Sequence, residues 1–177
     1  MLGICKSQRD DHNMSFWTLE TKADIGICGF SNTVENLFRE LTLGMMHLLV
    51  STDQAKKLDS IQRRTAQWNT NISNASHDYE LLIIIWLEEV LYKLEVESKF
   101  LVDAQFMIKH EQDATHCRAQ VSWVDADLVT RDVEIKAVTS HELSIAKLNA
   151  NEVFTSNDVS IPELVGPAWV GTVIFDI

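Results

Sequence analysis

Apolar residues recur at helical spacing over the stretch Val34–Leu49 and form one continuous stripe. This period predicts a helix that runs to about Val50. Asn32 is placed to act as its N-cap, and Glu35 follows three residues later, which is a variant of the capping box. The sequence therefore predicts an amphipathic helix that buries one face.

A second helix is expected from about Tyr79 to Val96, with Asp78 or Ser76 as its cap. Its first half, residues 81–87, is apolar all round, and the second half becomes amphipathic. A helix without a polar face is typical of a segment that is enclosed on most sides.

The other apolar stretches have the shorter period of β-strands. A strand pair is expected within Phe16–Phe30, and Ala66–Ile72 is a weaker candidate inside an otherwise loop-like region, residues 51–76. A strand pair, two helices and a run of strands predict an α+β domain, with two main helices packed on one face of a mostly antiparallel sheet. The later candidate strands are Phe100–Ile108, Ala119–Val124, Val133–Ala137, Glu142–Leu148 and Trp169–Ile177.

The 177 residues are enough for one domain with a substantial core. Residues 1–14 are polar and patternless, so we expect an N-terminal extension followed by one domain over residues 15–177. Within it, residues 149–167 are expected to form a long loop that carries both prolines, Pro162 and Pro167.

The net charge of −11 argues against general binding of nucleic acid, which requires clustered Lys and Arg. The basic runs Lys56-Lys57 and Arg63-Arg64 are short and typical of solvated helix faces. An acidic surface suits a protein that docks on a basic partner or holds divalent cations. Nothing indicates an obligate assembly, and we expect a monomer.

The three cysteines, Cys5, Cys28 and Cys117, are odd in number and lack metal-ligand spacing. A reducing intracellular compartment is the simplest interpretation, with Cys28 filling core space and Cys5 exposed. No early apolar run of signal-peptide type is present, and the longest apolar run, residues 81–87, is too short to span a bilayer. We expect a cytoplasmic protein, with the nucleus as a further location.

Two carboxylates stand at expected strand ends. Asp176 and Ile177 close the last apolar stretch, so the Asp176 side chain would adjoin a terminal carboxylate, and Asp24 lies in a run of similar character. Anions this close repel unless a cation joins them, and oxygen ligands suit a hard cation. The simpler interpretation, preferred on the pattern alone, is a pair of solvated strand ends.

The segment from Lys136 to Leu143 is a second candidate. Lys136 lies among apolar neighbours, which would lower its pKa if it were buried without a partner, and Asp24, Glu89 or Asp176 could supply that partner. The simpler interpretation is a β-hairpin with a Thr-Ser-His turn, in which His141 has no special role.

The sequence lacks several motifs that are typical of catalytic or zinc-binding sites. The sequence has no Gly-rich phosphate loop and no serine nucleophile elbow. His110 and His116 lie beside Cys117, but their spacing fits no standard zinc motif and an exposed loop is expected there. No nucleophile with its base is evident, so we do not expect an enzyme.

Separated blocks of the chain resemble the archease family, in the same order and at similar spacing over residues 16 to 177. Each block is weak alone, and the ordered set is specific. The matching blocks are Ala23-Asp24-Ile25-Gly26, Leu37-Phe38, Leu43-Gly44-Met45, Leu81-Leu82, Trp86-Leu87-Glu88-Glu89-Val90-Leu91, Lys136-Ala137-Val138-Thr139-Ser140-His141 and the final Asp176-Ile177.

The resemblance implies a single two-layer α+β domain. It also implies an accessory protein that promotes guanylylation and multiple turnover of the GTP-dependent RNA ligase of tRNA splicing, without joining RNA itself. It further implies a bound divalent cation, usually calcium, with magnesium or manganese as alternatives. By residue match the ligands are Asp24, Asp176 and the main-chain oxygen of Ile177.

The chain departs from the family pattern in places. Thr21 and Lys22 stand where the family usually has His-Thr, and His47 occupies the region where the first helix often carries an acid, with Asp53 slightly further on. Residues 149–167 resemble an inserted loop. A lost acidic ligand would weaken cation binding, and Lys22 could replace part of the cation's charge.

Two alternatives therefore stay open. One is a chaperone-like or scaffolding protein that binds partners without a metal. The other is a small metal-dependent hydrolase built around Asp24, Asp176 and His141, which would need a nucleophile that the sequence does not reveal.

Overall fold

The computed structural model describes residues 16–20, 24–73 and 77–177. None of the helices in these ranges is long and apolar enough to cross a membrane. In chain order the elements are β1 (Phe16–Glu20), β2 (Ile25–Ser31), α1 (Val34–Leu48), α2 (Thr52–Leu58), β3 (Arg64–Ser73), α3 (Tyr79–Glu95), β4 (Lys99–Glu111), β5 (Ala114–Asp125), the 3-10 turn η1 (Ala126–Leu128), β6 (Ala137–Leu148), β7 (Val153–Phe154), β8 (Leu164–Val165) and β9 (Ala168–Asp176).

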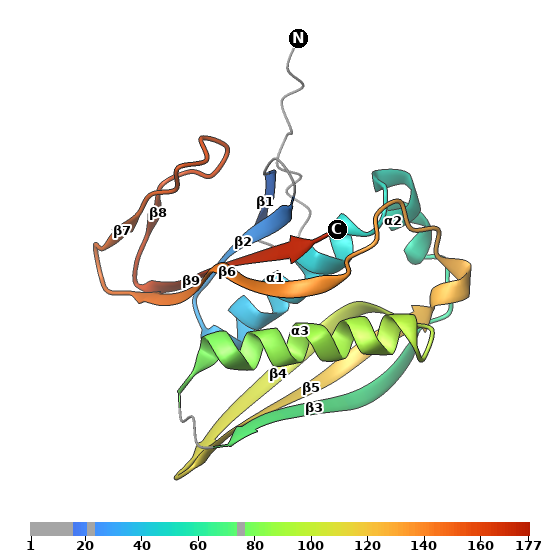
Figure 1. Ribbon diagram of the computed structural model, residues 1–177, viewed down its shortest axis with the longest axis horizontal. Helices are drawn as coiled ribbons and strands as arrows, with labels where there is room; N and C mark the ends of the chain where they lie inside the picture. The colour runs from blue at the N-terminus through green and yellow to red at the C-terminus, as the bar shows by residue number, and fades with distance from the viewer. Residues whose placement is uncertain (1–15, 21–23, 74–76) are drawn as a thin grey trace.

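The strands form two main antiparallel sheets, one with the order β1-β2-β9-β6 and one with the order β3-β5-β4. Helices α1 and α3 lie between the sheets and contact strands of both (Figure 1). The expected α+β class, with two main helices on mostly antiparallel strands, is confirmed. The structure adds that the strands divide into two sheets, so that each helix is covered on two sides.

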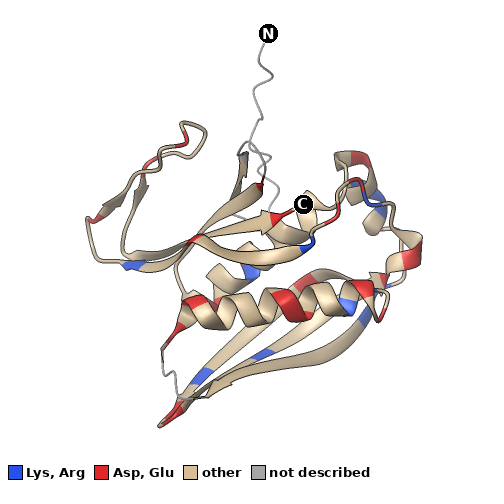
Figure 2. Cartoon of the chain, viewed as in Figure 1, with Lys and Arg blue, Asp and Glu red and all other residues tan. Residues whose placement is uncertain are grey.

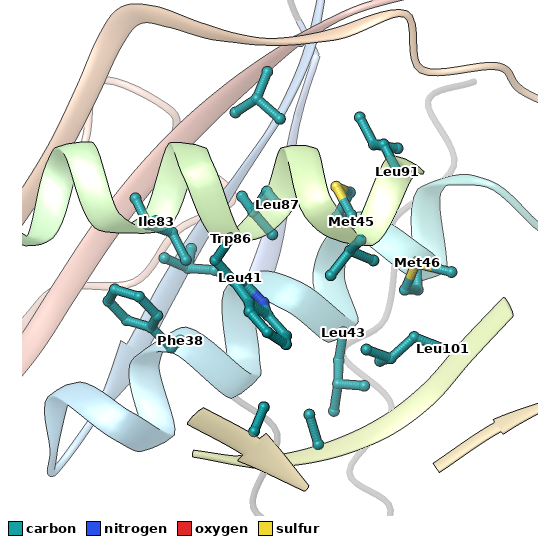
Figure 3. Close-up of a cluster of buried hydrophobic side chains, with 14 of the residues drawn as sticks. Phe38, Leu41, Leu43, Met45, Met46, Ile83, Trp86, Leu87, Leu91 and Leu101 are labelled. Carbon is teal, nitrogen blue, oxygen red and sulfur yellow. The ribbon is translucent and has the colours of Figure 1, made fainter. Parts of the chain in front are cut away.

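The main core fills the space around the two helices. Trp86 of α3 is fully buried, and its ring meets Phe106 of β4 edge-on at 4.8 Å and Trp68 of β3 at 6.3 Å. Figure 3 shows Trp86 beside Phe38 and Leu41 of α1. Large apolar side chains from both helices thus replace water between the sheets, which is the dominant favourable term in folding.

The helix boundaries agree with the expected ones within a few residues. The N-cap of α1 is Thr33 rather than Asn32, and its side-chain oxygen accepts a hydrogen bond from the Asn36 nitrogen at 3.1 Å. Asp78 caps α3 as expected, accepting from the Leu81 nitrogen at 2.9 Å. Ser76, the alternative cap, lies outside the described residues.

Two other expectations were wrong. Of the expected strand 133–137, residues 133–136 are not in a strand, because pairing with β9 begins only at Ala137, where β6 starts. The segment from Ser140 to Leu143 is not a hairpin turn but a bulge inside β6, where the register with β9 shifts between Thr139 and Ser144. Glu142 within it has a positive φ of 51°.

The outer face of the four-stranded sheet carries a second, smaller core. The segment 149–167 includes the short hairpin β7–β8, and its Ile161 and Leu164 are buried against Cys28 and Val170 of the sheet. The segment expected to be a plain loop therefore covers apolar surface. Burial raises the pKa of the Cys28 thiol to about 11, in keeping with the expected core-filling role.

Candidate functional site

Asp24 and Asp176 come together at one end of the β2–β9 ladder. Ile25 pairs with Phe175 in this ladder. Asp24 directly precedes Ile25, and Asp176 directly follows Phe175, so the two aspartates stand beside each other. Paired residues of antiparallel strands lie roughly 4.5–5.5 Å apart at Cα. Phe175 is fully buried toward the helices, so alternation along the strand directs Asp176 to the opposite face, where it is exposed.

Lys136 lies at the same end of the sheet. Its backbone nitrogen donates to the Asp176 carbonyl oxygen at 2.8 Å, and its Nζ donates to the main-chain oxygen of Ile177 at 2.9 Å. The side chain is exposed, not buried, and its partner is a main-chain oxygen instead of the carboxylates of Asp24, Glu89 or Asp176. An ammonium thus holds one of the oxygens expected to bind a cation.

The donor set at this end fits a hard divalent cation by chemistry. Two carboxylates and a main-chain oxygen are oxygen ligands of the kind that calcium and magnesium prefer. Within residues 16–20, 24–73 and 77–177, no cluster of three or more His, Cys, Asp or Glu side chains could hold a metal. A cation here would need further ligands beyond these three oxygens, and the Lys136 ammonium would compete with it for the Ile177 oxygen.

Two further candidates lie elsewhere. Glu89 forms an ion pair with Lys93 on the same helix at 3.2 Å. His141 projects from the β6 bulge, with its ring 3.7 Å from a Glu142 oxygen, while Asp176 pairs with Ala137 further along the strand. The hydrolase alternative, which needs His141 together with the two acids, gains no support from this arrangement.

The departures from the family pattern fall in different places. His47 is exposed in the last turn of α1 and meets the Phe16 ring edge-on at 5.7 Å. Asp53 lies in the first turn of α2, 3.6 Å from the Lys56 ammonium. Thr21 and Lys22 lie outside the described residues.

Sequence reasoning missed a polar network at the start of α3. His110 was expected in a loop, but it lies on β4, where its Nε2 is 2.9 Å from the Tyr79 hydroxyl and its Nδ1 is 3.1 Å from the Thr115 hydroxyl. The His77 ring stacks on it at 3.9 Å. Burial, and then the neighbouring charge of His77, lower the pKa of His110.

A second missed residue is Glu88. Its Oε1 accepts a 2.8 Å hydrogen bond from the Val138 nitrogen, so it ties α3 to β6. The amphipathic pattern of α3 predicts only that Glu88 lies on the polar face of the helix. No sequence signal could have found this contact, because the partners are 50 positions apart.

The comparisons with known proteins agree on one family. The model of the Archease protein family (MTH1598/TM1083) matches residues 16–177. The archease of Pyrococcus furiosus is 30% identical over 133 residues, covering 73% of this chain and 86% of the relative. The archease of Methanosarcina barkeri is 32% identical over 135 residues, covering 73% of this chain and 84% of the relative. The archease of Danio rerio is 19% identical over 144 residues, covering 80% and 83%.

One solved structure shows the same fold. The solution structure of protein 1598 from Methanobacterium thermoautotrophicum has a TM-score of 0.60 and 19% identity, covering 93% of this chain and 99% of that one. A crystal structure from Thermotoga maritima, described as an archease and possible chaperone, has a TM-score of 0.40 and 15% identity, covering 90% and 94%. On the family match over residues 16–177, this chain belongs to the archease family.

Proposed function

We propose that this chain is an accessory protein of the GTP-dependent RNA ligase of tRNA splicing, which promotes guanylylation and multiple turnover of that ligase without catalysing the joining itself. Membership of the archease family supports the proposal. The observation that carries it is the β2–β9 ladder, which brings Asp24 beside Asp176. The role implies action in the cytoplasm, with the nucleus as a further location, as a monomer that meets the ligase.

The proposed cation ligands are the carboxylates of Asp24 and Asp176 and the main-chain oxygen of Ile177. The family resemblance implies calcium as the cation, with magnesium or manganese as alternatives, and all three accept such oxygen ligands. When bound, the cation would supply positive charge at an acidic edge that docks on the nucleotide pocket of the ligase.

Lys136 is placed to compete with a cation for one of the proposed ligands. Its ammonium donates to the Ile177 oxygen, so ammonium and cation compete for one ligand. A site with few carboxylates and a competing ammonium would release its cation readily, which suits a protein that delivers or repositions a cation.

Ligase turnover tests the proposal. The tRNA-splicing ligase from the same source would be assayed with excess RNA halves and GTP, with and without this protein. We expect wild type to raise the number of turnovers, and Asp24→Ala and Asp176→Ala each to lose most of that effect. Asp113→Ala, an exposed acid at the β4–β5 turn, is the matched control and should act like wild type. If both site variants stimulated as well as wild type, the proposed site would be wrong.

A metal-independent, chaperone-like or scaffolding role is the second candidate. Two observations favour it: Lys136 already bonds the Ile177 oxygen, and the described residues include no group of three or more His, Cys, Asp or Glu side chains that could hold a metal ion. Ligase binding that is unchanged in excess chelator, by calorimetry or by sedimentation, would support this role over the metal-dependent one.

A further inference from the structure

The three-stranded sheet turns one face to the helices and the other away from them. Alternation along β3 and β5 buries Trp68 and Cys117 on the helix side and directs their neighbours outward. The outward side chains form three rows across β3, β5 and β4, and these rows begin at Gln67, Asn69 and Asn71 on β3. The three rows are here called the amide face, because each begins with an exposed amide side chain.

The sheet that carries the amide face is not acidic, although the chain has a net charge of −11. Asp103, one of its acids, is 2.9 Å from the guanidinium of Arg39 on α1. Figure 2 shows Lys and Arg spaced along the strands of this sheet, whereas α3 carries mostly Asp and Glu. The basic residues of β3, β4 and β5 are Arg64, Lys99, Lys109 and Arg118, and their acids are Asp103, Glu111 and Asp125. The negative charge of the chain is therefore concentrated outside this sheet.

Lys109 and Arg118 on the amide face have no carboxylate partner in the described part of the chain. Neither side chain forms an ion pair or a hydrogen bond there. Both line a hollow of about 400 Å³, together with His116 and two asparagines. Glu111 lines it at the β4–β5 turn, with its Oε2 3.5 Å from His116 Nε2. In a chain with 26 acidic and 15 basic residues, two unpaired cations in one hollow are available to an anion from outside.

The strand register places these two cations within reach of one ligand. His116 pairs with Lys109 on one side and Asn71 on the other, and Arg118 pairs with Asn69 in the next row. Lys109 and Arg118 are therefore diagonal neighbours, roughly 7–8 Å apart at Cα, which long side chains can span. A guanidinium offers two parallel N–H groups to an oxyanion, and an ammonium adds a compact charge. The hollow therefore suits a phosphate group.

The amides beside the hollow favour a nucleic acid over an acidic protein segment. Gln67, Gln120 and Gln105 pair across the three strands and form one exposed row. Each amide offers a donor and an acceptor, as the edges of nucleobases do. A carboxylate only accepts hydrogen bonds, so an acidic segment would leave the amide oxygens unpaired. An extended single strand could place a phosphate in the hollow and its bases on the glutamine row.

The acids of the proposed cation site lie on the other side of the molecule. Helices α1 and α3 separate the two sheets (Figure 1), and Asp176 points to the face of its sheet that is turned away from them. A helix layer is about 10 Å thick, and exposed charges more than about 8 Å apart are largely screened at physiological ionic strength. On α3, Glu89 and Glu95 are paired with Lys93 and Arg131. These acids therefore do little to repel a phosphate from the amide face.

We propose that the amide face binds single-stranded RNA, with a backbone phosphate held by Lys109 and Arg118 and base edges on the row of Gln67, Gln120 and Gln105. The choice of RNA rests on the proposed function, because the ligase joins RNA halves, while the phosphate site rests on the geometry of the sheet. None of the proposed cation ligands belongs to this surface.

Titration of the full chain with a short RNA, without the ligase, tests the proposal. The probe is a fluorescein-labelled strand of about nine adenosine and uridine nucleotides, a length that one such surface accommodates. Chelator is present, so that no cation bridges the RNA to the acids. Two phosphate contacts predict a slope of about −1.4 for the logarithm of affinity against that of salt, so binding should weaken about sevenfold from about 50 to 200 mM salt. Absence of binding at the lower salt concentration would overturn the proposal.

Two double variants separate the phosphate contacts from the base contacts. Lys109→Gln with Arg118→Gln should weaken RNA binding about tenfold or more and flatten its salt dependence, because both phosphate contacts are lost. Gln105→Ala with Gln120→Ala should weaken binding less and leave the salt slope unchanged, because base contacts release no counterions. Unchanged affinity in the first variant would overturn the proposal.

A matched control removes the same charge elsewhere. Lys56→Gln with Lys57→Gln alters two exposed lysines on α2, outside the sheet, and should bind RNA like wild type. An equal loss in this control would show that only the net charge matters, and would overturn the site. Residue-resolved NMR of the full chain with unlabelled RNA should shift signals of the amide face. Shifts confined to other surfaces would also overturn it.

Two other occupants are distinguished by further measurements. An acidic peptide of about nine residues that bound as tightly as the RNA would assign the amide face to a protein partner and overturn the assignment to RNA. In sedimentation equilibrium we expect wild type to remain monomeric. A dimer that dissociates in the Lys109→Gln, Arg118→Gln variant would show that a second copy covers the surface, which would overturn the proposal as well.

The RNA titration and the ligase assay can fail independently. A chain that stimulated the ligase but did not bind RNA would overturn this inference alone. A chain that bound RNA on the amide face but left ligase turnover unchanged would overturn the proposed function alone.

Discussion

The Val138 nitrogen on edge strand β6 donates a 2.8 Å hydrogen bond to Oε1 of Glu88 on α3. We expect Glu88→Ala to lower the free energy of unfolding by about 1–2 kcal/mol, because a backbone donor loses a charged acceptor. Glu88→Gln keeps an acceptor and should lose less. Urea denaturation measures both, with the exposed Glu163→Ala as the control. Equal stability of Glu88→Ala and wild type would show that water replaces the carboxylate at no cost.

Thr42 joins the two helices inside the core. Its hydroxyl donates to the Phe38 carbonyl oxygen at 2.6 Å and accepts from the Trp86 indole nitrogen at 2.9 Å. Thr42→Val should cost about 1–3 kcal/mol, because the buried indole N–H loses its acceptor. In a Trp86→Phe background the same change should cost clearly less, and this double-mutant difference measures the bond. Equal losses of stability in both backgrounds would mean that the loss comes from Thr42 itself and not from its hydrogen bond with Trp86.

The pKa of His110 is held below its ordinary value of 6.5, first by burial and then by His77. The folded protein therefore binds fewer protons here than the unfolded chain, and this contribution favours folding more as pH rises. It is present in full above about pH 6.5 and is lost as pH falls through the lower folded pKa. We expect His110→Gln to flatten the fall in Tm on acidification, measured by scanning calorimetry. An unchanged pH slope would contradict this.

The buried thiols should be unreactive in the folded protein. Burial raises the pKa of Cys28 to about 11 and that of Cys117 to about 12, so little thiolate exists near neutral pH. In a Cys5→Ser background we expect slow modification by a disulfide reagent at pH 8, and fast modification after unfolding. Rapid reaction of both thiols without denaturant would show that the core opens readily.

Lys136 should oppose cation binding if the proposed site is correct. Its Nζ donates to the Ile177 oxygen, so Lys136→Ala removes a competitor and a positive charge. Calcium titration by calorimetry should show tighter binding to Lys136→Ala than to wild type, and no binding to Asp176→Asn. Weaker binding to Lys136→Ala would mean that the lysine orders the site instead of competing for it.

Much of the fold followed from hydrophobic periodicity. The apolar stripes of α1 and α3 predicted both helices, and alternation predicted most strands, because burial of one face dictates both patterns. Helix α2 was missed, since none of its residues is buried and it leaves no apolar period. Its local signs were weak: a Ser51 cap, Asp53 in the first turn and Lys56 with Lys57 in the last.

The remaining errors arise from contacts between distant segments. Ile135 is buried, which gives residues 133–137 the apolar pattern of a strand. It nevertheless lies before β6 and has no partner in the β6–β9 ladder. The division into two sheets depends on which strands pair, and that is not encoded in any one segment. The juxtaposition of Asp24 and Asp176 was expected, whereas the contact of Lys136 with Ile177 was not, because it depends on how β6 begins.

No strand among the described residues belongs to both main sheets. Backbone pairing therefore makes each sheet cooperative within itself, while cooperativity between the sheets depends on the side chains of α1 and α3 packed between them. A large cavity in that layer, such as Trp86→Ala would create, should weaken the coupling between the sheets as well as the stability. We expect the wild-type protein to melt in one step and this variant in two, with the sheet that contains Trp68 lost first, which scanning calorimetry would test.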